Sequence, residues 1–439
     1  MENLFIPRVR IFYQMEYPTI IATVGGEGTR LFPLTLNISK PLVDICNQAV
    51  LTRMLEPLVL QGCRRIVMAS KGYENTVQLN KYFKSGAGFF KRLGVEDGQE
   101  FEYQPNYEDK GSGDAVRCCM EYYGVKGDAL VVSGDNLFDI ELDAILRQHR
   151  EKGALLTIGL KELGPQEDIS QFGVAKLDKD MRVSAFVEKP KPGTEPSRLI
   201  NTSIYVFSQE IRRVFREMGD RVKDMGRDVI PYLTEKGYPV YGYILRGYWA
   251  DVGTPGWFWK TSMDILHGEL KNIKREHEYK PGQWIHPDTV CRTNGLDGVR
   301  IKGTALIGRA CQIGRNVTIE DSTIGHTCII AEGTTIRESV VNSFANIGKN
   351  TILNRCILGR YTTVEENSRI DAGIEVEFPV ASQDRIPVVG GGGVTIVRNS
   401  VIGPGKRVAP IHQSHRILST GRFIELGYDK ENVYFRERV

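Results

Sequence analysis

Aliphatic residues recur at a short, nearly constant interval through the C-terminal half of the chain, and this period constrains the fold most strongly. Most steps between them are six residues long, and a few are five. The series is Ile301, Ile307, Ile313, Ile319, Ile324, Ile330, Ile336, Val341, Ile347, Ile352, Leu358, Val364 and Ile370. A hexapeptide period with one aliphatic residue per repeat is typical of a parallel β-helix, in which each aliphatic side chain points into a narrow core. An irregular strand-rich domain is the alternative.

Glycine accompanies this period and also gathers near the N-terminus. The chain has 46 glycines in 439 residues, about a tenth, against roughly 7% in average proteins. Several directly follow an aliphatic position, where we expect them to relieve the corners of the β-helix; these are Gly308, Gly314, Gly325, Gly348 and Gly359. The run of four glycines at 390–393 has no basic neighbour of the kind that binds phosphate, so it predicts a loop.

The N-terminal half alternates short apolar runs with longer amphipathic segments. We expect strands at 19–24, 65–70, 129–133 and 154–159, with helices at 50–61 and 141–151. Strands that alternate with helices in this way favour crossover connections and a largely parallel, Rossmann-like α/β sheet. From 164 to 254 the pattern changes to hairpins at 172–177, 183–188 and 200–207, a helix from 209 and a strand at 241–245, and a helix at 257–274 follows.

Charge and cysteine content exclude several classes of protein. Lys plus Arg total 57 and Asp plus Glu total 54, a net charge of +3, whereas nucleic-acid binders usually carry a strong basic excess. The eight cysteines form no Cys-x-x-Cys pair, so reduced thiols are the default. No stretch approaches the ~20 apolar residues of a membrane helix, and the start lacks the apolar run of a signal peptide. We therefore expect a soluble cytoplasmic protein that binds neither nucleic acid nor membrane.

The segment at 25–31, Gly-Gly-Glu-Gly-Thr-Arg-Leu, carries the strongest chemical signal. It follows a predicted strand, and Lys40-Pro41 comes shortly after it. Glycines let backbone N–H groups approach a polyphosphate, and Arg30 and Lys40 add positive charge. The Gly-Lys-Ser/Thr of a Walker loop is absent, and the spacing differs from the dinucleotide fingerprint.

Four further motifs follow in order along the chain. They are Gly-Asp-Asn at 134–136, Phe-Gly-Val at 172–174 with Glu-Lys-Pro at 188–190, Asn201 at the start of a strand, and Trp-Ala-Asp-Val-Gly-Thr-Pro at 249–255. Together with the glycine segment, this series resembles the sugar-1-phosphate nucleotidylyltransferases over roughly residues 17–260. Many members of that family carry a left-handed β-helix at the C-terminus, so the resemblance extends to most of the chain.

The resemblance implies a reaction in which a sugar-1-phosphate attacks the α-phosphorus of a nucleoside triphosphate and expels pyrophosphate. The attacking phosphate is ionised near pH 7, so catalysis should consist of positioning and charge stabilisation. Arg30 and Lys40 would stabilise the triphosphate. Asp135 and Asp251 would hold Mg²⁺, which prefers carboxylate and phosphate oxygens. Without that context, Asp135 would be a helix cap and Asp251 a turn residue.

The same resemblance assigns the binding residues. Gly25, Gly26, Gly28, Thr29, Gln104 and Gly111 would bind the nucleotide, and Gly173, Glu188, Lys189 and Asn201 would bind the sugar phosphate. Two departures from the family pattern affect these assignments. The link at 107–110 is longer than usual, and Ser203 stands where relatives often have glycine. A side chain at Ser203 would alter the sugar pocket.

Neither base nor sugar follows from the residues. The sequence around Gly-Asp-Asn favours glucose-1-phosphate with dTTP or UTP, with a mannose-1-phosphate guanylyltransferase or a glucose-1-phosphate adenylyltransferase as alternatives. A non-catalytic regulatory subunit on the same fold is disfavoured, because every charged motif residue is retained. A second, acyltransferase activity of the β-helix would need a catalytic histidine, and His286, His326, His412 and His415 lie in no such motif.

The predicted organisation has five parts: an N-terminal extension at 1–16, a nucleotidyltransferase domain at 17–262, a helix and linker at 263–285, a β-helix at 286–376, and a C-terminal segment at 377–439 that contains the glycine run. Because a β-helix offers flat faces for packing, we expect a homo-oligomer assembled through it.

Overall fold

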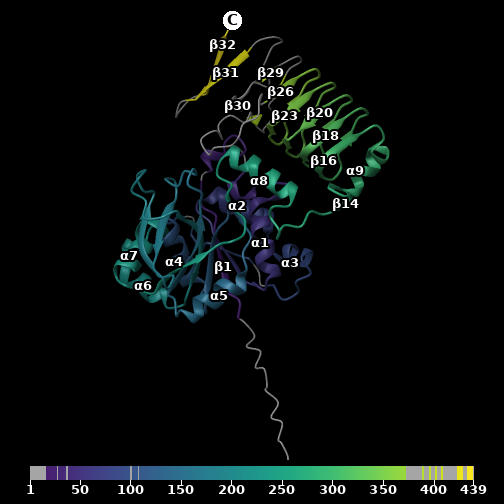
Figure 1. Ribbon diagram of the computed structural model, residues 1–439. Helices are drawn as coiled ribbons and strands as arrows, with labels where there is room; N and C mark the ends of the chain where they lie inside the picture. Colours follow the sequence, from purple (N-terminus) through teal and green to yellow (C-terminus); the bar gives the residue numbers. More distant parts are fainter. Residues whose placement is uncertain are drawn as a thin grey trace, which may run out of the picture.

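The computed structural model describes residues 16–371, except 27, 36–37, 99–100 and 107, together with the backbone of six short strands between 388 and 438. It consists of an α/β domain and a β-helix, with helix α8 between them (Figure 1). The glycine run at 390–393, His412 and His415 lie outside the described residues, as do most of the predicted extension and C-terminal segment.

A nine-stranded sheet forms the centre of the α/β domain, in the order β10-β9-β11-β6-β1-β4-β5, with β8 joined to β11 and β12 joined to β8. Its strands are β1 (Thr19–Thr23), β4 (Ile66–Ala69), β5 (Glu102–Tyr103), β6 (Ala129–Ser133), β8 (Leu156–Glu162), β9 (Gly173–Leu177), β10 (Val183–Glu188), β11 (Leu199–Phe207) and β12 (Val240–Ile244). β1 pairs in parallel with β4 and β6, and β4 with β5, whereas β11 runs antiparallel to its neighbours. The predicted mostly parallel sheet is confirmed.

Helices cover both faces of this sheet. They are α1 (Val50–Leu60), α2 (Tyr73–Phe83), α3 (Ala87–Arg92), α4 (Ser112–Tyr122), α5 (Leu142–Glu151), α6 (Ile211–Met218), α7 (Ile230–Glu235) and α8 (Pro255–His267). Successive residues of β1 point to opposite faces, so Ile20 packs in one core cluster with residues of α1 and α8, and Ile21 in another with residues of α4 and α6. Burial on both faces explains why the centre of the strand, residues 20–22, is continuously apolar rather than alternating.

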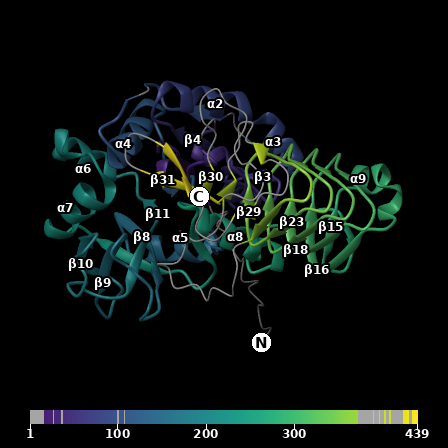
Figure 2. The same cartoon turned by 90° about the horizontal axis from the view of Figure 1, so that it is seen from above.

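The C-terminal domain is a parallel β-helix, as predicted. Its strands are β14 (Glu278–Lys280), β15 (Gln283–Ile285), β16 (Arg300–Ile307), β17 (Gln312–Ile313), β18 (Thr318–Ile324), β19 (Ile329–Ile330), β20 (Thr335–Arg337), β21 (Val340–Val341), β22 (Asn346–Ile347), β23 (Ile352–Asn354), β24 (Ile357–Leu358), β25 (Thr363–Val364) and β26 (Arg369–Asp371), and helix α9 is Pro287–Arg292. Ile319, Ile336, Leu353 and Ile370 stack in register through parallel pairings. Figure 2 shows these coils side by side.

The inward-facing series differs from the predicted one at a single position. Ile352 is 40% exposed, whereas Leu353 is fully buried. The six-residue step therefore runs from Ile347 to Leu353 and the five-residue step from Leu353 to Leu358. Both neighbours are aliphatic, so the sequence period alone could not distinguish them.

The glycines after the aliphatic positions have a different role from the predicted one. Left-handed backbone occurs instead at residues such as Asn316, Thr327 and Asn350. A Cβ on Gly308, Gly314, Gly325 or Gly348 would collide with backbone of the following coil. These glycines therefore allow close stacking of coils rather than special dihedral angles.

The two domains share one apolar core. Leu306, Val340 and Ile357 of the β-helix belong to the same buried cluster as residues of α1 and α8. Polar contacts surround this region: Trp259 Nε1 donates to the carbonyl oxygen of Glu338 (2.6 Å), and Asn47 Nδ2 donates to that of Ile324 (3.1 Å). The domains are therefore packed together rather than tethered.

Two predicted boundaries need correction. The helix expected at 257–274 ends at His267, because Gly268 adopts a left-handed conformation (φ 86°) that terminates α8. The segment predicted as helix and linker also contains β15, which already pairs in parallel with β16. In the described part of the chain, no helix is both long and apolar enough to span a bilayer.

Candidate active site

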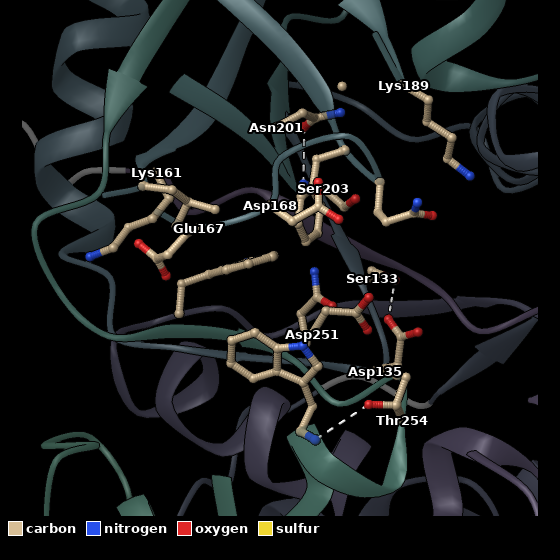
Figure 3. A pocket seen from close by; sticks show the side chains of 18 of the residues that line it. Ser133, Asp135, Lys161, Glu167, Asp168, Lys189, Asn201, Ser203, Asp251 and Thr254 are labelled. Carbon is tan, nitrogen blue, oxygen red and sulfur yellow. Dashed lines mark hydrogen bonds between the residues drawn. The ribbon is translucent and has the colours of Figure 1, made fainter. Parts of the chain in front are cut away.

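The two acids predicted to hold a metal ion meet at the carboxyl edge of the sheet. β1 and β6 are parallel neighbours whose last residues, Thr23 and Ser133, are paired. Asp135 follows β6 and precedes β7 (Asn136–Phe138), and β7 pairs antiparallel with β13 (Trp249–Asp251), placing Asp251 opposite Asn136. The Val252 N–H also donates to the backbone carbonyl of Asp135 (3.0 Å). Residues 116 positions apart in the chain are thereby brought side by side, as Figure 3 shows.

Two basic side chains face these acids. The buried Lys40 ammonium contacts the Asp135 carboxylate and lies 3.6 Å from Asp251 Oδ1. Arg30 Nη2 lies 3.7 Å from Asp251 Oδ2, and its side chain is 63% exposed. Lys40 is therefore fixed between the acids, whereas most of the Arg30 side chain remains accessible to a ligand.

The two carboxylates have opposite pKa shifts. Burial alone would raise the pKa of Asp135, but the charge of Lys40 and hydrogen bonds from Lys40 and Ser133 outweigh it and lower the pKa. Burial and the negative charge of Asp135 raise the pKa of Asp251, against the weaker opposing effects of Lys40 and Arg30. The two pKa shifts differ because Lys40 contacts Asp135 directly and Asp251 only at longer range.

This pair fits a divalent cation. Asp251 Oδ1 is buried and makes no hydrogen bond to any described residue. The Lys40 ammonium lies at ion-pair distance from this oxygen (3.6 Å), and a buried carboxylate oxygen beside a second carboxylate is a favourable environment for a hard cation. The described residues contain no group of three or more His, Cys, Asp or Glu side chains arranged for a metal. Asp135 and Asp251 would thus supply only part of a coordination shell, and a ligand or water would supply the rest.

Two cavities adjoin at Ser133 and Asp135, which line both. The first, of about 590 Å³, lies toward β9, β10 and β11, and the second, of about 270 Å³, lies toward the glycine segment and the start of α4. Asp251 and Arg30 line the first cavity, and Lys40 lines the second. The acids and bases therefore stand at the junction of two binding spaces.

Half of the predicted nucleotide residues line the second cavity. Gly25, Gly26 and Gly111 form part of its wall. Gly25 must be glycine because a Cβ would lie 2.8 Å from the Cβ of Lys71. The other three predicted residues, Gly28, Thr29 and Gln104, line neither cavity.

Each of these three residues has a local structural role. Gly28 has φ 67° and precedes the 3₁₀ turn η1 (Thr29–Leu31), which begins with Thr29. Gln104 is buried behind Asp109, to which its Nε2 donates (3.3 Å), and Asp109 forms part of the cavity wall in its place. These three residues therefore support the wall instead of forming it.

All four predicted sugar-phosphate residues, Gly173, Glu188, Lys189 and Asn201, line the first cavity. In Figure 3, Lys189 and Asn201 lie across the cavity from the two aspartates. The Asn201 amide donates to the Tyr205 hydroxyl (2.8 Å) and accepts from the Ser203 N–H (3.0 Å). Lys189 has a left-handed backbone, φ 49°, and its N–H donates to the Phe172 carbonyl (3.0 Å).

Comparison with protein families agrees with this arrangement. Residues 19–268, more than half of the chain, match the family model described as nucleotidyl transferase. The chain belongs to the nucleotidyl transferase family. Residues 296–417 match a second model, described as the GMPPB C-terminal domain.

Curated relatives of this nucleotidyl transferase align over most of their length. A UTP–glucose-1-phosphate uridylyltransferase from Synechocystis sp. is 30% identical over 322 residues, covering 68% of this chain and 81% of the relative. A glucose-1-phosphate adenylyltransferase from Trichlorobacter lovleyi is 30% identical, covering 68% and 82%. A mannose-1-phosphate guanylyltransferase from Mycobacterium tuberculosis is 28% identical, covering 69% and 79%.

Several wall residues of this nucleotidyl transferase were not predicted. In the second cavity they include Lys71 and Asp109, and in the first Lys161, Asp168 and Trp257. Ser112 and Ala115 of the second cavity belong instead to the 111–115 segment, for which the resemblance implies contact with the base. Ser133 stands at the junction, and its hydroxyl donates to Asp135 (2.5 Å). The position of Ser133, directly before Gly-Asp-Asn at the end of a strand, was a usable signal. The other unpredicted residues come from separate parts of the chain, Lys161 from β8 and Trp257 from α8, and belong to no motif.

The two described histidines named as acyltransferase candidates make structural contacts. His286 Nδ1 accepts from the Asp288 N–H at the start of α9 (3.2 Å). His326 Nδ1 accepts from the Arg309 N–H (2.9 Å), and its Nε2 lies 3.3 Å from the Asn47 carbonyl oxygen. These contacts cap a helix and join the two domains, and they provide no support for a catalytic role.

Proposed function

We propose that the chain transfers a nucleotidyl group from a nucleoside triphosphate to a sugar-1-phosphate and releases pyrophosphate. The observation that carries this proposal is the junction of two cavities at Asp135, with basic groups on both sides. A triphosphate in the second cavity and a sugar phosphate in the first would bring two phosphorus centres together at this junction.

The chain's own residues would act by position and charge. Lys189 would hold the sugar phosphate on the far wall of the first cavity, with Glu188 and Asn201 facing the sugar hydroxyls. Arg30 and Lys40 would stabilise the negative charge that accumulates on the departing pyrophosphate. A phosphate monoester has a second pKa of about 6, so its oxygen needs no general base at pH 7.

We propose Asp135 and Asp251 as the residues that hold Mg²⁺. When bound, the ion would supply charge neutralisation to the phosphate oxygens. The buried Oδ1 of Asp251, which receives no hydrogen bond from the described residues, supports this role.

Substitution of each acid tests the metal assignment. Asp135→Asn and Asp251→Asn preserve shape but remove the charge, and each should lower kcat by roughly 10²-fold or more, by analogy with the loss of one preorganised charge-stabilising group. Turnover is followed as pyrophosphate release, with circular dichroism as the check on folding. Asp180→Asn, in the exposed turn after β9, is the control and should retain full activity. Near-normal turnover in both active-site variants would rule out the assignment.

We propose glucose-1-phosphate with UTP or dTTP as the substrates. The uridylyltransferase relative, which aligns over four-fifths of its length, supports this choice. A second candidate is mannose-1-phosphate with GTP, supported by the match of 296–417 to the GMPPB C-terminal domain. Pyrophosphate release over a grid of four nucleoside triphosphates and several sugar-1-phosphates separates the two. The first proposal requires the highest kcat/KM for a pyrimidine triphosphate with glucose-1-phosphate.

We also propose assembly into a homo-oligomer through the β-helix. Ile329 and Ile352, which are 44% and 40% exposed on outward faces of β19 and β23, support this proposal. Sedimentation of the full chain at micromolar concentration should give more than a monomer mass, and a monomer would contradict the proposal.

A further inference from the structure

A short segment after α6 contacts wall residues of both cavities: Ser112 of the second cavity and Glu188 of the first. It comprises Lys223, Asp224 and the π-helical turn η4 (Met225–Val229). On one side it meets the loop at the start of α4, where the Asp114 N–H donates to the Lys223 carbonyl (3.0 Å). That loop forms part of the nucleotide cavity through Gly111 and Ser112.

Asp224 fastens the loop to η4. The Ser112 hydroxyl donates to Asp224 Oδ2 (3.2 Å) and accepts from the Met225 N–H (2.9 Å). Asp224 Oδ1 accepts from the Arg227 N–H (2.9 Å), which caps η4. A π-helical turn is rare in proteins and occurs frequently near functional sites. Its placement here depends on the same carboxylate that holds Ser112.

The other side of η4 supports Glu188, a wall residue of the first cavity. Gly226 has no side chain, and a Cβ there would collide with the Glu188 carboxylate. The Glu188 carboxylate therefore lies directly against the backbone of η4. Burial, followed by the negative charge of Asp224, raises the pKa of Glu188 against the charges of Lys189 and Arg227. The two carboxylates are thus close enough to affect each other.

We propose that Asp224 is a positioning residue that links the nucleotide cavity to the sugar-phosphate cavity. Through Ser112 it fixes the loop against which the nucleotide would bind, and through η4 it fixes the backbone that supports Glu188. Ordering of the loop by a nucleotide therefore orders Glu188 for the sugar phosphate, and the two ligands bind cooperatively. The proposal rests on the proposed function, because that function gives Glu188 its role toward the sugar.

Binding measurements on the full chain test the link. The Kd of glucose-1-phosphate is measured by calorimetry with and without a non-hydrolysable α,β-methylene UTP, in the presence of MgCl₂. The wild-type chain should bind the sugar phosphate at least about fivefold more tightly with the analogue, the lower end of typical coupling between sites. In Asp224→Ala this ratio should fall to near one. A ratio near one in the wild-type chain, or a wild-type ratio in folded Asp224→Ala, overturns the proposal.

Two further variants keep the test decisive. Ser112→Ala removes the contact with Asp224 but leaves the Arg227 N–H cap of η4, so it should lower the ratio even where Asp224→Ala fails to fold. Lys110→Ala is the matched control: it breaks the exposed Lys110–Asp220 ion pair (2.7 Å), which joins the loop before α4 to the turn just before the segment of Asp224. This control should keep the wild-type ratio of Kd values. A ratio near one in Lys110→Ala would indicate a general structural effect and would overturn the role of Asp224.

The outcome is distinguishable from failure of the proposed function. If the wild-type chain releases no pyrophosphate with any substrate pair, the function fails. If the wild-type chain does release pyrophosphate but Asp224→Ala shows unchanged coupling between the two ligands, the proposed function stands and only the role of Asp224 fails. A rise in KM for glucose-1-phosphate in Asp224→Ala, rescued in part by Asp224→Asn, which keeps the cap acceptor, supports a positioning role.

Discussion

At the scale of single residues, the first cavity, which we propose as the sugar cavity, is lined by two residues on left-handed backbone, Lys189 (φ 49°) and Ser203 (φ 60°). Non-glycine residues reach this region at a cost of roughly 1 kcal/mol or more. Ser203 lies where β11 departs from regular pairing with β8. Such local strain is retained when the side chain contributes something that glycine would not.

Ser203→Gly should therefore raise stability and, separately, change the selectivity between sugars. Relief of the backbone strain should raise the free energy of unfolding by about 1 kcal/mol. Loss of the hydroxyl from the cavity wall should change the kcat/KM ratio between two sugar-1-phosphates by roughly threefold to tenfold, the equivalent of one hydrogen bond. Urea unfolding and pyrophosphate release measure the two effects.

Lys84→Gly provides the comparison for Ser203→Gly. Lys84 has φ 53° and follows α2, away from both cavities. It should show the gain in stability with unchanged sugar selectivity. Unchanged selectivity in Ser203→Gly as well would exclude Ser203 from specificity.

A second residue-scale prediction concerns the pH dependence of stability. His149 of α5 is buried, its Nδ1 lies 2.8 Å from Thr157 Oγ1, and its Nε2 has no hydrogen-bond partner among the described residues. Burial lowers the pKa of His149 from 6.5 to about 4. As pH falls below 6.5, the unfolded chain binds a proton that the folded chain does not bind, so stability falls with pH.

The size of this effect is about 1.4 kcal/mol per pH unit between 6.5 and the folded pKa. Between pH 7 and pH 5, His149 should thus account for about 2 kcal/mol of lost stability. His149→Gln lacks the titrating group, so its free energy of unfolding, measured with urea, should fall by that much less over the same interval. Parallel pH profiles for the two proteins would contradict the prediction.

At the scale of elements, close stacking of the β-helix coils requires glycine, which has no side chain, at certain positions. A Cβ on Gly325 would collide with the backbone of Ser343 in the next coil. Gly325→Ala should therefore lower the free energy of unfolding by roughly 1–3 kcal/mol, as overpacking of a tight core does. Thermal unfolding measures the change.

Gly88→Ala is the matched control for this substitution. Gly88 lies within α3, and a Cβ there would meet no described atom within 4 Å. The same change should be neutral or stabilising by up to about 1 kcal/mol. Equal effects at the two positions would show that coil stacking does not restrict Gly325.

The sequence predicted elements better than their details, for physical reasons. The strands at 129–133 and 183–188 were predicted with their observed bounds, since a short buried strand is a local pattern. The choice between Ile352 and Leu353 was wrong, because two adjacent aliphatic residues satisfy the period equally. The order of the motifs along the chain was enough to assign charged residues such as Asp135 and Asp251 to one site. Gln104 lies behind Asp109 and lines neither cavity, a detail that the sequence could not show because the side of a loop that faces a cavity depends on tertiary packing.

At the scale of the whole molecule, the two domains should unfold together. Trp259 of α8 is buried between them, with the Arg355 guanidinium 5.3 Å from its ring. Because one apolar cluster spans both domains, we expect a single calorimetric transition for the wild-type chain. Trp259→Ala should cost about 3–5 kcal/mol and should separate the transition into two.

Trp257→Ala tests whether this effect is specific to the interface. Trp257 belongs to the same helix but faces the sugar cavity. Its loss should raise KM for the sugar phosphate while leaving one transition. Two transitions in the wild-type chain would contradict the shared core.

The position of Lys40 between the two aspartates has a consequence for the empty enzyme. Two partly buried carboxylates with no cation beside them would repel each other and destabilise the folded chain. The Lys40 ammonium, fixed at the start of its 3₁₀ turn η2 (Lys40–Leu42), serves as a counter-ion that the chain carries with it. The site can therefore stay assembled between turnovers, and this edge of the sheet can fold without a bound ligand.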